Sequence, residues 1–426
     1  MLRDGVLPSY LGWRETHGDV LKLCAPRGND WYLFAHPADV EQILLGSYRT
    51  YHKGTLLNRV RRILGNGLFT NDNDLWRDHR RAVQPVFRTN RHPDFARVMN
   101  GASAEMVERW RLLAKRGEPF DLLDEMSRVT IQNAGLTLFS EDFALLYDRM
   151  GRDLKFVVQR MNVYNFWKAR TADPRLYLAL GKLHSLISQL IAKRRRALAA
   201  GEEVPDDLLS ALLRGRDSQG DPFSDAELHN EILTFIFVGH ETTALSLAWT
   251  WLLLCQNPGW MQRAQDEVDM MLGGRTPTMD DLETLPTVKN SFLESLRIYP
   301  PVWGIPRNTT QEVEIGGFCI PKKATVLTLP YITHRHPEFW PDAERFDPDR
   351  FTAPNSAGRP RFAYFPFGGG PRLCVAMGFA TMEAQLILTA ILQNFHVELV
   401  ENQKFDLVLW VTLRPKNGIK VRIHCR

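Results

Sequence analysis

The fold is decided by the stretch Phe367-Gly368-Gly369-Gly370-Pro371-Arg372-Leu373-Cys374. The sequence predicts a helix directly behind it, over residues 375–395, so Cys374 should lie at or near a helix N-terminus. Exposed backbone N–H groups and the positive end of the helix dipole stabilise a thiolate at such a position. The glycines allow unusual φ angles and the close approach of a flat partner. Arg372 adds a fixed positive charge two residues before the sulfur.

A lone thiolate held in this way suits an axial iron ligand, because it leaves the opposite face of a haem open. The alternative is a buried structural cysteine after a glycine turn. The spacing Phe-x-x-Gly-x-Arg-x-Cys favours the ligand, and it resembles the haem-binding loop of the cytochrome P450 superfamily of haem-thiolate monooxygenases. The resemblance makes Cys374 the proximal iron ligand, with Phe367 and Arg372 among the cofactor-binding residues. Ala376 departs from the family pattern, which usually has glycine there.

Composition excludes several other classes of protein. Hydrophobic residues make up 44% and charged residues 24% of the chain, which is typical of a globular protein with a large core. The mean hydropathy is −0.26, and the longest nearly apolar run, 245–255, is shorter than the ~18 residues of a spanning helix. The five cysteines are odd in number and far apart, which indicates a reducing compartment. A net charge of +4 is too small to indicate nucleic acid.

The length of 426 residues suggests two or three domains as a prior. No linker or repeat divides the sequence, so we expect one catalytic domain over residues 1–426. Helical periodicity dominates, which predicts a mostly α protein with small β-sheets, and the resemblance implies the cytochrome P450 fold. The patterns predict strands at 21–23, 31–34, 312–320, 325–329 and within 405–423, and helices at 37–45, through most of 76–213, and at 226–256, 261–272, 288–299 and 375–395.

Glu294 and Arg297 share a face of a predicted helix because they stand at i and i+3. An exposed pair of this kind contributes only ~0–1 kcal/mol. The apolar neighbours Phe292 and Leu296 indicate burial instead, and a buried carboxylate needs further donors. The pair resembles the family's ExxR motif, and Arg345 matches the arginine that completes its triad. The implied role is structural.

The run Val238-Gly239-His240-Glu241-Thr242-Thr243 lies in the middle of the longest predicted helix. Helical spacing predicts one stripe that contains Phe235, Val238, Gly239, Thr242, Ser246 and Trp249. On it the Thr242 hydroxyl can donate to the Val238 carbonyl. An ordinary buried helix is the alternative. The run resembles the family's oxygen-activating motif, which implies that Glu241 and Thr242 are catalytic and supply protons. Val238 stands where the family usually has alanine or glycine, and should narrow the space above the iron.

Trp76 and Arg80, at i and i+4, resemble the family's WxxxR signature. A core tryptophan beside a surface arginine is the alternative. The resemblance implies that Trp76 and Arg80 bind a haem propionate, and that Arg307 does the same after the ExxR helix. Together with Arg372 they would form an anion clamp of charge-assisted hydrogen bonds.

The resemblance implies a monooxygenase that uses haem b and dioxygen to hydroxylate or epoxidise a hydrophobic small molecule of terpenoid, fatty acyl, steroid or polyketide type. Positions that match the family's pocket-lining loops are nearly all apolar or aromatic, as such a substrate requires. These positions are Leu64, Phe69, Val157, Met161, Val163, Phe166, Phe235, Val238, Val302, Trp303, Ile305, Leu409 and Trp410.

Two other functions are compatible with the same loop. A haem-thiolate isomerase, dehydratase or peroxygenase would not activate dioxygen, and such relatives tend to lose the acid–threonine pair that is present here as Glu241 and Thr242. A haem-based sensor or carrier without turnover would not need that pair. The monooxygenase is therefore the favoured interpretation.

The chain ends some thirty residues after its last predicted long helix, so we expect electrons from a separate ferredoxin or flavodoxin-type donor. Clustered arginines could steer an acidic donor, and a solvated basic helix is the alternative. With no apolar segment behind Met1, we expect a cytoplasmic enzyme without a membrane span. The clustered arginines are Arg77, Arg80, Arg81, Arg88 and Arg91.

Overall fold

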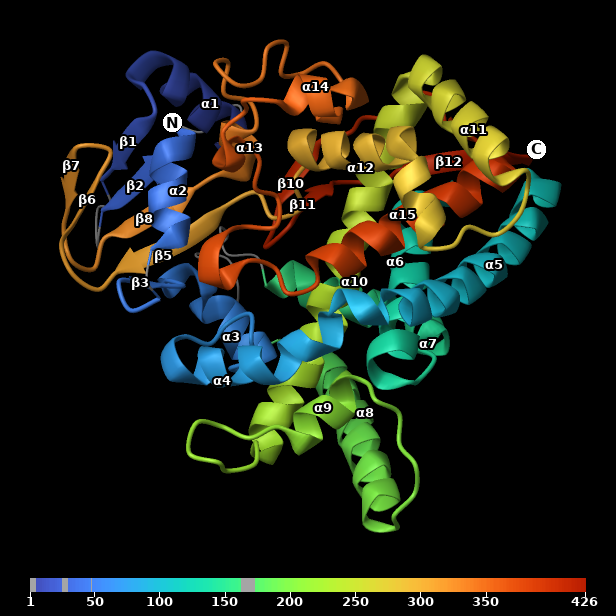
Figure 1. The fold of residues 1–426 in the computed structure, drawn as a ribbon, viewed down its shortest axis with the longest axis horizontal. Helices are drawn as coiled ribbons and strands as arrows, with labels where there is room; N and C mark the ends of the chain where they lie inside the picture. Colours follow the sequence, from blue (N-terminus) through green and yellow to red (C-terminus); the bar gives the residue numbers. More distant parts are fainter. Residues whose placement is uncertain (1–4, 25–29, 47, 162–172) are drawn as a thin grey trace. The chain divides into compact units, whose positions relative to one another are not determined.

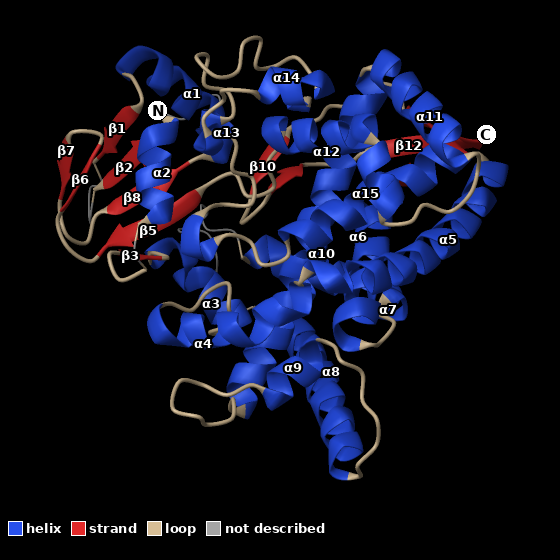
Figure 2. Ribbon diagram, viewed as in Figure 1, coloured by secondary structure: helices blue, strands red, loops and turns tan. Residues whose placement is uncertain are grey.

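The computed structural model describes residues 5–24, 30–46, 48–161 and 173–426. Helices dominate and the strands form small sheets (Figure 2), which confirms the predicted class, mostly α with small β-sheets. By their internal contacts the residues form two compact units. The first unit comprises Met1–Asn58 and Leu293–Val375, and the second comprises Arg59–Phe292 and Ala376–Arg426. The single catalytic domain over 1–426 stays a prediction.

The first unit is built on a five-stranded sheet with the order β1-β2-β8-β5-β3. β2 and β8 run parallel, and the other neighbours are antiparallel. Tyr32 and Phe34 of β2 pack with Ile43 of α2, which lies along the sheet in Figure 1. The elements are α1 (Val6–His17), β1 (Val20–Leu23), β2 (Trp31–Phe34), α2 (Pro37–Leu45), β3 (Tyr51–His52), β5 (Ile305–Thr309), β6 (Val313–Ile315), β7 (Phe318–Ile320), β8 (Thr325–Thr328), α13 (Pro330–Thr333) and α14 (Ala353–Ser356).

The second unit is a helical assembly around α10, with α6 packed along it and α5 packed against α15 (Figure 1). Its strands form a three-stranded sheet, β4-β12-β9, and the hairpin β10-β11. α12 begins in this unit and ends in the first one. The elements are α3 (Asn58–Leu64), α4 (Asn73–Val83), α5 (His92–Arg116), β4 (Phe120–Asp121), α6 (Leu122–Ala134), α7 (Ala144–Arg160), α8 (Pro174–Ala199), α9 (Leu208–Arg214), α10 (Asp225–Gln256), α11 (Pro258–Leu272), α12 (Pro286–Ile298), α15 (Met377–Asn394), β9 (Phe395–Leu399), β10 (Leu407–Leu409), β11 (Leu413–Pro415) and β12 (Lys420–Cys425).

Local signals set the limits of α10. Its N-terminus has a capping box, in which the backbone N–H of Ser224 donates to the Glu227 carboxylate at 2.8 Å and the Glu227 N–H donates to the Ser224 hydroxyl at 3.3 Å. Its C-terminus stops before Asn257-Pro258. By length and composition α10 could cross a membrane, but 83% of its apolar window is buried inside the protein. That burial is typical of a core helix.

Glu383 of α15 is a buried acid in the helical core. The Asn133 side-chain amide, on α6, donates to its carboxyl at 3.0 Å. Thr243 of α10 also hydrogen-bonds it. Burial outweighs both hydrogen bonds and raises the pKa of Glu383 to about 8. The side chain is therefore largely a neutral acid at pH 7.

We predict that Glu383 makes the stability of the protein decrease as pH rises. The folded-state pKa of about 8 exceeds the ordinary 4.5, so the native state binds the proton more tightly than the unfolded state. The free energy of unfolding should then fall between pH 4.5 and pH 8, by ~1.4 kcal/mol for each pKa unit of the shift. Glu383→Gln should remove this decrease, because the amide carries no charge.

Denaturant titration of the wild type and of Glu383→Gln at pH 5 and pH 8 measures this difference. The exposed Glu401, in the turn after β9, provides a matched control, and Glu401→Gln should follow the wild type at both pH values. A stability difference between Glu383→Gln and the wild type that is the same at both pH values would contradict the prediction.

Candidate active site

The cysteine loop of the first unit has a closely constrained backbone. The N–H of Cys374 donates to the Phe367 carbonyl at 3.0 Å, which closes the loop on itself. Gly368 and Gly370 have φ values of 74° and 64°, in the left-handed region that favours glycine. A side chain on Gly370 would also collide with the backbone of Leu44 in α2. The conformation therefore requires the glycines that the sequence supplies.

Cys374 itself is half-buried. α15 begins three residues later, at Met377, and its N-cap is Ala376. Cys374 therefore precedes a helix N-terminus, as the sequence predicts. Cys374 is therefore partly exposed and is held by a loop with a constrained backbone.

Two of the predicted propionate-binding arginines lie together in the first unit. Arg307 and Arg372 line one small hollow with Leu44 and Tyr48, and the remaining lining residues are Gly46 and Pro371. Arg372 donates to the Tyr51 carbonyl at 2.6 Å, which fixes its guanidinium. Arg307 is buried and donates to the Pro306 carbonyl at 2.9 Å. Two guanidinium groups therefore contribute to the lining of the same hollow.

Glu294 and Arg297 form a completely buried ion pair with two N–O distances of 2.7 and 2.8 Å. Arg297 also donates to the His334 carbonyl at 3.0 Å, and its guanidinium lies over the Trp340 ring at 5.1 Å. Glu294 accepts from the Asp347 N–H at 3.0 Å. These additional partners are what a buried pair needs.

The third member of this triad is Arg350, and the prediction of Arg345 was wrong. Arg350 is buried and lies 3.3 Å from the Glu294 carboxylate. The side chain of Arg345 is 65% exposed and pairs with Asp347 instead. Only the backbone carbonyl of Arg345 takes part, as an acceptor from Arg297 at 3.3 Å. The sequence contains Glu-Arg-Phe at 344–346 and Asp-Arg-Phe at 349–351, and the second lies in a 3₁₀ turn that directs its arginine inward.

His334 connects the triad to the cysteine loop. Its ring nitrogen Nε2 accepts from the N–H of Phe365 at 2.9 Å, and the Phe365 carbonyl accepts from the N–H of Gly368 at 2.9 Å. Burial, followed by the charges of nearby arginines, lowers the pKa of His334 well below its ordinary value. The neutral ring is the form that can accept a hydrogen bond.

The middle of α10, in the second unit, has one narrow stripe that is only partly buried, which we call the exposed stripe. Within residues 231–254, all of which the structure describes, only Val238, Gly239 and Thr242 are not buried. The Thr242 hydroxyl donates to the Val238 carbonyl at 3.2 Å, as predicted. A side chain on Gly239 would approach Ala134 of α6 at 3.7 Å, an ordinary contact. Half of the predicted stripe is therefore partly exposed, and the other three of its residues, Phe235, Ser246 and Trp249, are buried in the core.

Glu241 is buried beside this stripe and is paired, which the sequence did not predict. Its carboxylate forms an ion pair with Arg414 of β11 and accepts from the Thr412 hydroxyl at 3.2 Å. Arg414 is also buried, 4% exposed. No local pattern connects residues 173 positions apart. The one indication of such a partner is general: a buried carboxylate such as that of Glu241 requires a cation.

Trp76 and Arg80 lie one turn apart on α4, also in the second unit. Trp76 is buried, and Arg80 is half-buried and donates to the Gln84 side chain at 3.3 Å. α4 is attached to α10 by the buried ion pair of His79 with Glu231. Burial disfavours the charged imidazole, but the hydrogen bonds and charges of Glu231 and Glu227 outweigh it and raise the pKa of His79. The propionate clamp that would combine Trp76 and Arg80 with Arg307 and Arg372 stays a prediction.

The predicted pocket wall is partly described. In the second unit Leu64, Val157, Met161 and Phe235 are buried. Trp410, at the tip of the hairpin β10-β11, is half-buried. Val163 and Phe166 lie outside the described residues. The substrate pocket itself stays a prediction.

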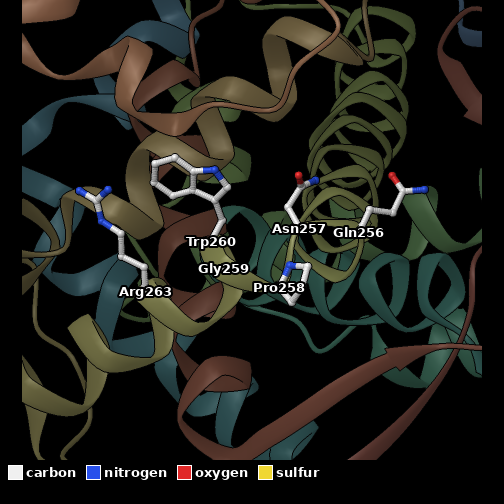
Figure 3. A pocket seen from close by; sticks show the side chains of 6 residues that line it. All are labelled: Gln256, Asn257, Pro258, Gly259, Trp260 and Arg263. Atoms are coloured by element: carbon white, nitrogen blue, oxygen red, sulfur yellow. The ribbon is translucent and has the colours of Figure 1, made fainter.

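A separate surface hollow lies where α10 meets α11 (Figure 3). In it Arg263 lies over the Trp260 ring at 4.9 Å. The hollow begins 14 residues after Thr242 along α10, roughly 21 Å at 1.5 Å per residue. It is therefore distinct from the exposed stripe. Its lining residues are Gln256, Asn257, Pro258, Gly259, Trp260 and Arg263.

Comparison with known proteins identifies the family. The family model for cytochrome P450 matches residues 13–422, and the chain belongs to this family. It is 35% identical to cyclooctatin synthase of Streptomyces melanosporofaciens, over 93% of this chain and 86% of that protein. It is 31% identical to pentalenene oxygenase of Streptomyces avermitilis, over 98% and 92% of the two chains.

A solved structure shows the same fold. The structure of a cyanobacterial cytochrome P450 with retinoic acid bound matches with a TM-score of 0.87 and 26% identity, covering 100% of this chain and 95% of that chain. The predicted cytochrome P450 fold is therefore confirmed. The family also establishes that the protein is a monooxygenase that uses haem iron, dioxygen, a hydrophobic substrate and a redox partner.

We predict different effects for the two arginines near the ExxR pair. Arg350→Ala should lower the free energy of unfolding by about 1–3 kcal/mol, because it removes a cation from the buried Glu294. Arg345→Ala should leave the stability nearly unchanged, since its side chain is exposed. Denaturant titration of both variants measures the difference. Equal losses, or a larger loss for Arg345→Ala, would refute the assignment of Arg350 to the triad.

Proposed function

We propose that the protein is a haem-thiolate monooxygenase that hydroxylates or epoxidises a terpenoid. The observation that carries the proposal is the constrained Cys374 loop, closed by its own hydrogen bond and following two left-handed glycines. The relatives named for cyclooctatin and pentalenene, and the neighbour with bound retinoic acid, support a terpenoid over the other hydrophobic classes.

The described residues fit a haem. The half-buried Cys374 offers a single thiol, and Arg307 and Arg372, which line one hollow, carry guanidinium groups of the kind that bind carboxylates. The exposed stripe of α10 offers a small residue, Gly239, that leaves room for a flat group. The sequence has no Cys-x-x-Cys-His attachment site, so the cofactor is haem b, bound without covalent links to the ring.

The residues act on the reaction in distinct ways. When it is bound, haem with a thiolate ligand would supply the activation of dioxygen. Cys374 would provide the thiolate, Trp76, Arg80, Arg307 and Arg372 would hold the propionates, and Phe367 would help to bind the cofactor.

Thr242 and Glu241 are the catalytic proton donors of this scheme. The Thr242 hydroxyl is held toward the Val238 carbonyl, a bond that weakens the local helix and leaves a place for water. Glu241 is the adjacent acid from which protons are passed on to that hydroxyl. Val238 limits the space beside them.

The function is tested with haem-loaded protein, a chemical reductant, and pentalenene and retinoic acid as probes. The wild type should give the family's red-shifted Soret band with carbon monoxide and oxidise a probe only when dioxygen is present. Cys374→Ala should lose both properties, because the thiolate is lost. Cys319→Ala, which changes an exposed cysteine, should keep both.

Three outcomes of this experiment would refute different parts of the proposal. A normal Soret band in Cys374→Ala would refute the thiolate assignment. Product formed with peroxide but not with dioxygen would refute the monooxygenase mechanism. An intact Soret band without oxidation of either probe would contradict the terpenoid class alone.

The electron donor that we propose is a separate acidic ferredoxin or flavodoxin, in the cytoplasm. The arginines between residues 77 and 91 support this proposal unequally. Arg77 and Arg81 form ion pairs with Asp74 and Asp78 at 3.4 and 3.1 Å, which reduces their attraction for a partner. Arg88 is exposed, so its charge can attract an acidic partner.

Arg88→Glu should slow reduction by an acidic ferredoxin, and the defect should be largest at low ionic strength, where charges are least screened. Stopped-flow reduction at two salt concentrations measures it. Arg116→Glu, at the exposed end of α5, makes the same change of charge and should have little effect. Reduction rates of Arg88→Glu that match those of Arg116→Glu at both salt concentrations would exclude this docking surface.

A further inference from the structure

The ion pair between Glu241 and Arg414 joins two elements of the second unit. Glu241 lies in the middle of α10, and Arg414 lies in β11 of the C-terminal hairpin. Both side chains are buried, and the Thr412 hydroxyl donates to the same carboxylate oxygen at 3.2 Å. The acid next to Thr242 is therefore held by two groups from a single hairpin.

Arg414 is the cation that balances this acid. The titratable neighbours of the pair are His240 and Tyr147. Burial lowers the pKa of His240 and raises the pKa of Tyr147 far above its ordinary value, so both are neutral. Among the described residues, the ion pairs of Glu241 are with Arg414 alone. A buried carboxylate that loses its guanidinium has an uncompensated charge and moves toward water or toward another donor.

The same guanidinium also contacts the tip of the hairpin. It lies over the Trp410 ring at 4.7 Å, and the Trp410 N–H donates to the Thr412 carbonyl at 3.0 Å, which closes the turn. Trp410 is half-buried, and the resemblance to the family predicts it in the wall of the substrate pocket. Arg414 thus lies between the hairpin tip and the acid.

We propose that Arg414 is a positioning residue that fixes the Glu241 carboxyl for proton transfer to Thr242, and that it connects this step to the hairpin tip through Trp410. The inference rests on the proposed function, because it needs Glu241 and Thr242 to supply protons. Arg414 acts through Glu241 and does not itself donate the proton.

The hairpin has attachments that do not depend on Arg414. The Trp249 indole of α10 donates to the Leu413 carbonyl at 3.3 Å, and β10 pairs with β11 from Leu407–Pro415 to Leu409–Leu413. A change at Arg414 can therefore alter the position of the acid while the hairpin stays in place. Arg414→Gln removes the charge, and Arg414→Lys keeps it.

The experiment compares Arg414→Gln, Arg414→Lys, Glu241→Gln and Thr242→Ala in haem-loaded protein, with pentalenene as the probe, or retinoic acid if pentalenene is not oxidised. The measured quantity is product formed for each reductant consumed, with peroxide determined alongside. Arg414→Gln should lower this ratio at least fivefold and release peroxide, with KM within about twofold of the wild type. Arg414→Lys should restore much of the ratio, which a loss of packing alone would not allow.

The double variant Glu241→Gln/Arg414→Gln separates an effect on the position of Glu241 from a general loss of structure. It also contains no buried unpaired charge, so it can be used if Arg414→Gln alone does not fold. The double variant should form at least as much product for each reductant consumed as Glu241→Gln does, because Arg414 acts through the Glu241 carboxyl. A double-mutant cycle of unfolding free energies should independently show that the two side chains interact.

Two results would overturn the inference. Wild-type coupling in Arg414→Gln, with Glu241→Gln and Thr242→Ala both uncoupled, would overturn the role of Arg414 and leave the proposed proton supply intact. Wild-type coupling in both Glu241→Gln and Thr242→Ala would overturn the proposed proton supply and the role of Arg414 with it.

Discussion

The cysteine loop depends on the ion pair between Glu294 and Arg297. Charges that are removed from water must be compensated inside the protein, and satisfying this pair orders the surrounding chain. Arg297 fixes the backbone of His334, whose ring holds Phe365, and Phe365 holds the glycine turn at Gly368. A sequence of hydrogen bonds therefore leads from a structural ion pair to the loop that presents the thiol. The partners that offset the electrostatic cost of burying the pair thus also order the loop that contains Cys374.

The second unit also contains a buried acid, Glu241, and compensates its charge with different partners. Among the described residues, Glu241 has one cation, Arg414, and one hydroxyl donor, whereas Glu294 has two arginines and a backbone N–H. The smaller set of partners suits the proton transfer that we propose for Glu241, and the larger set suits an acid that must not move.

Local sequence signals predicted much of this structure. The proline at 258 marked the end of α10, and the i to i+4 spacing predicted the bond from Thr242 to the Val238 carbonyl. Nonlocal pairing was not predictable in the same way. Two similar tripeptides could supply the third residue of the triad. The 3₁₀ turn after residue 347 places Arg350, and not Arg345, against Glu294. Arg414 is paired with an acid 173 residues away, and no periodicity carries that information.

The exposed stripe of α10 also limits how this protein can diverge. Every other position between 231 and 254 is packed in the core, where a change of volume disturbs its neighbours. Under the proposed function, Thr242 is restricted by its chemistry, and Gly239 by the room that a flat group needs beside it. Val238 is then the position in this segment where side-chain size can vary at the least structural cost. Under the proposed function, natural substitutions that change substrate preference should therefore occur mainly at Val238 within the central part of the helix. Mutant libraries made to change that preference should vary the same position.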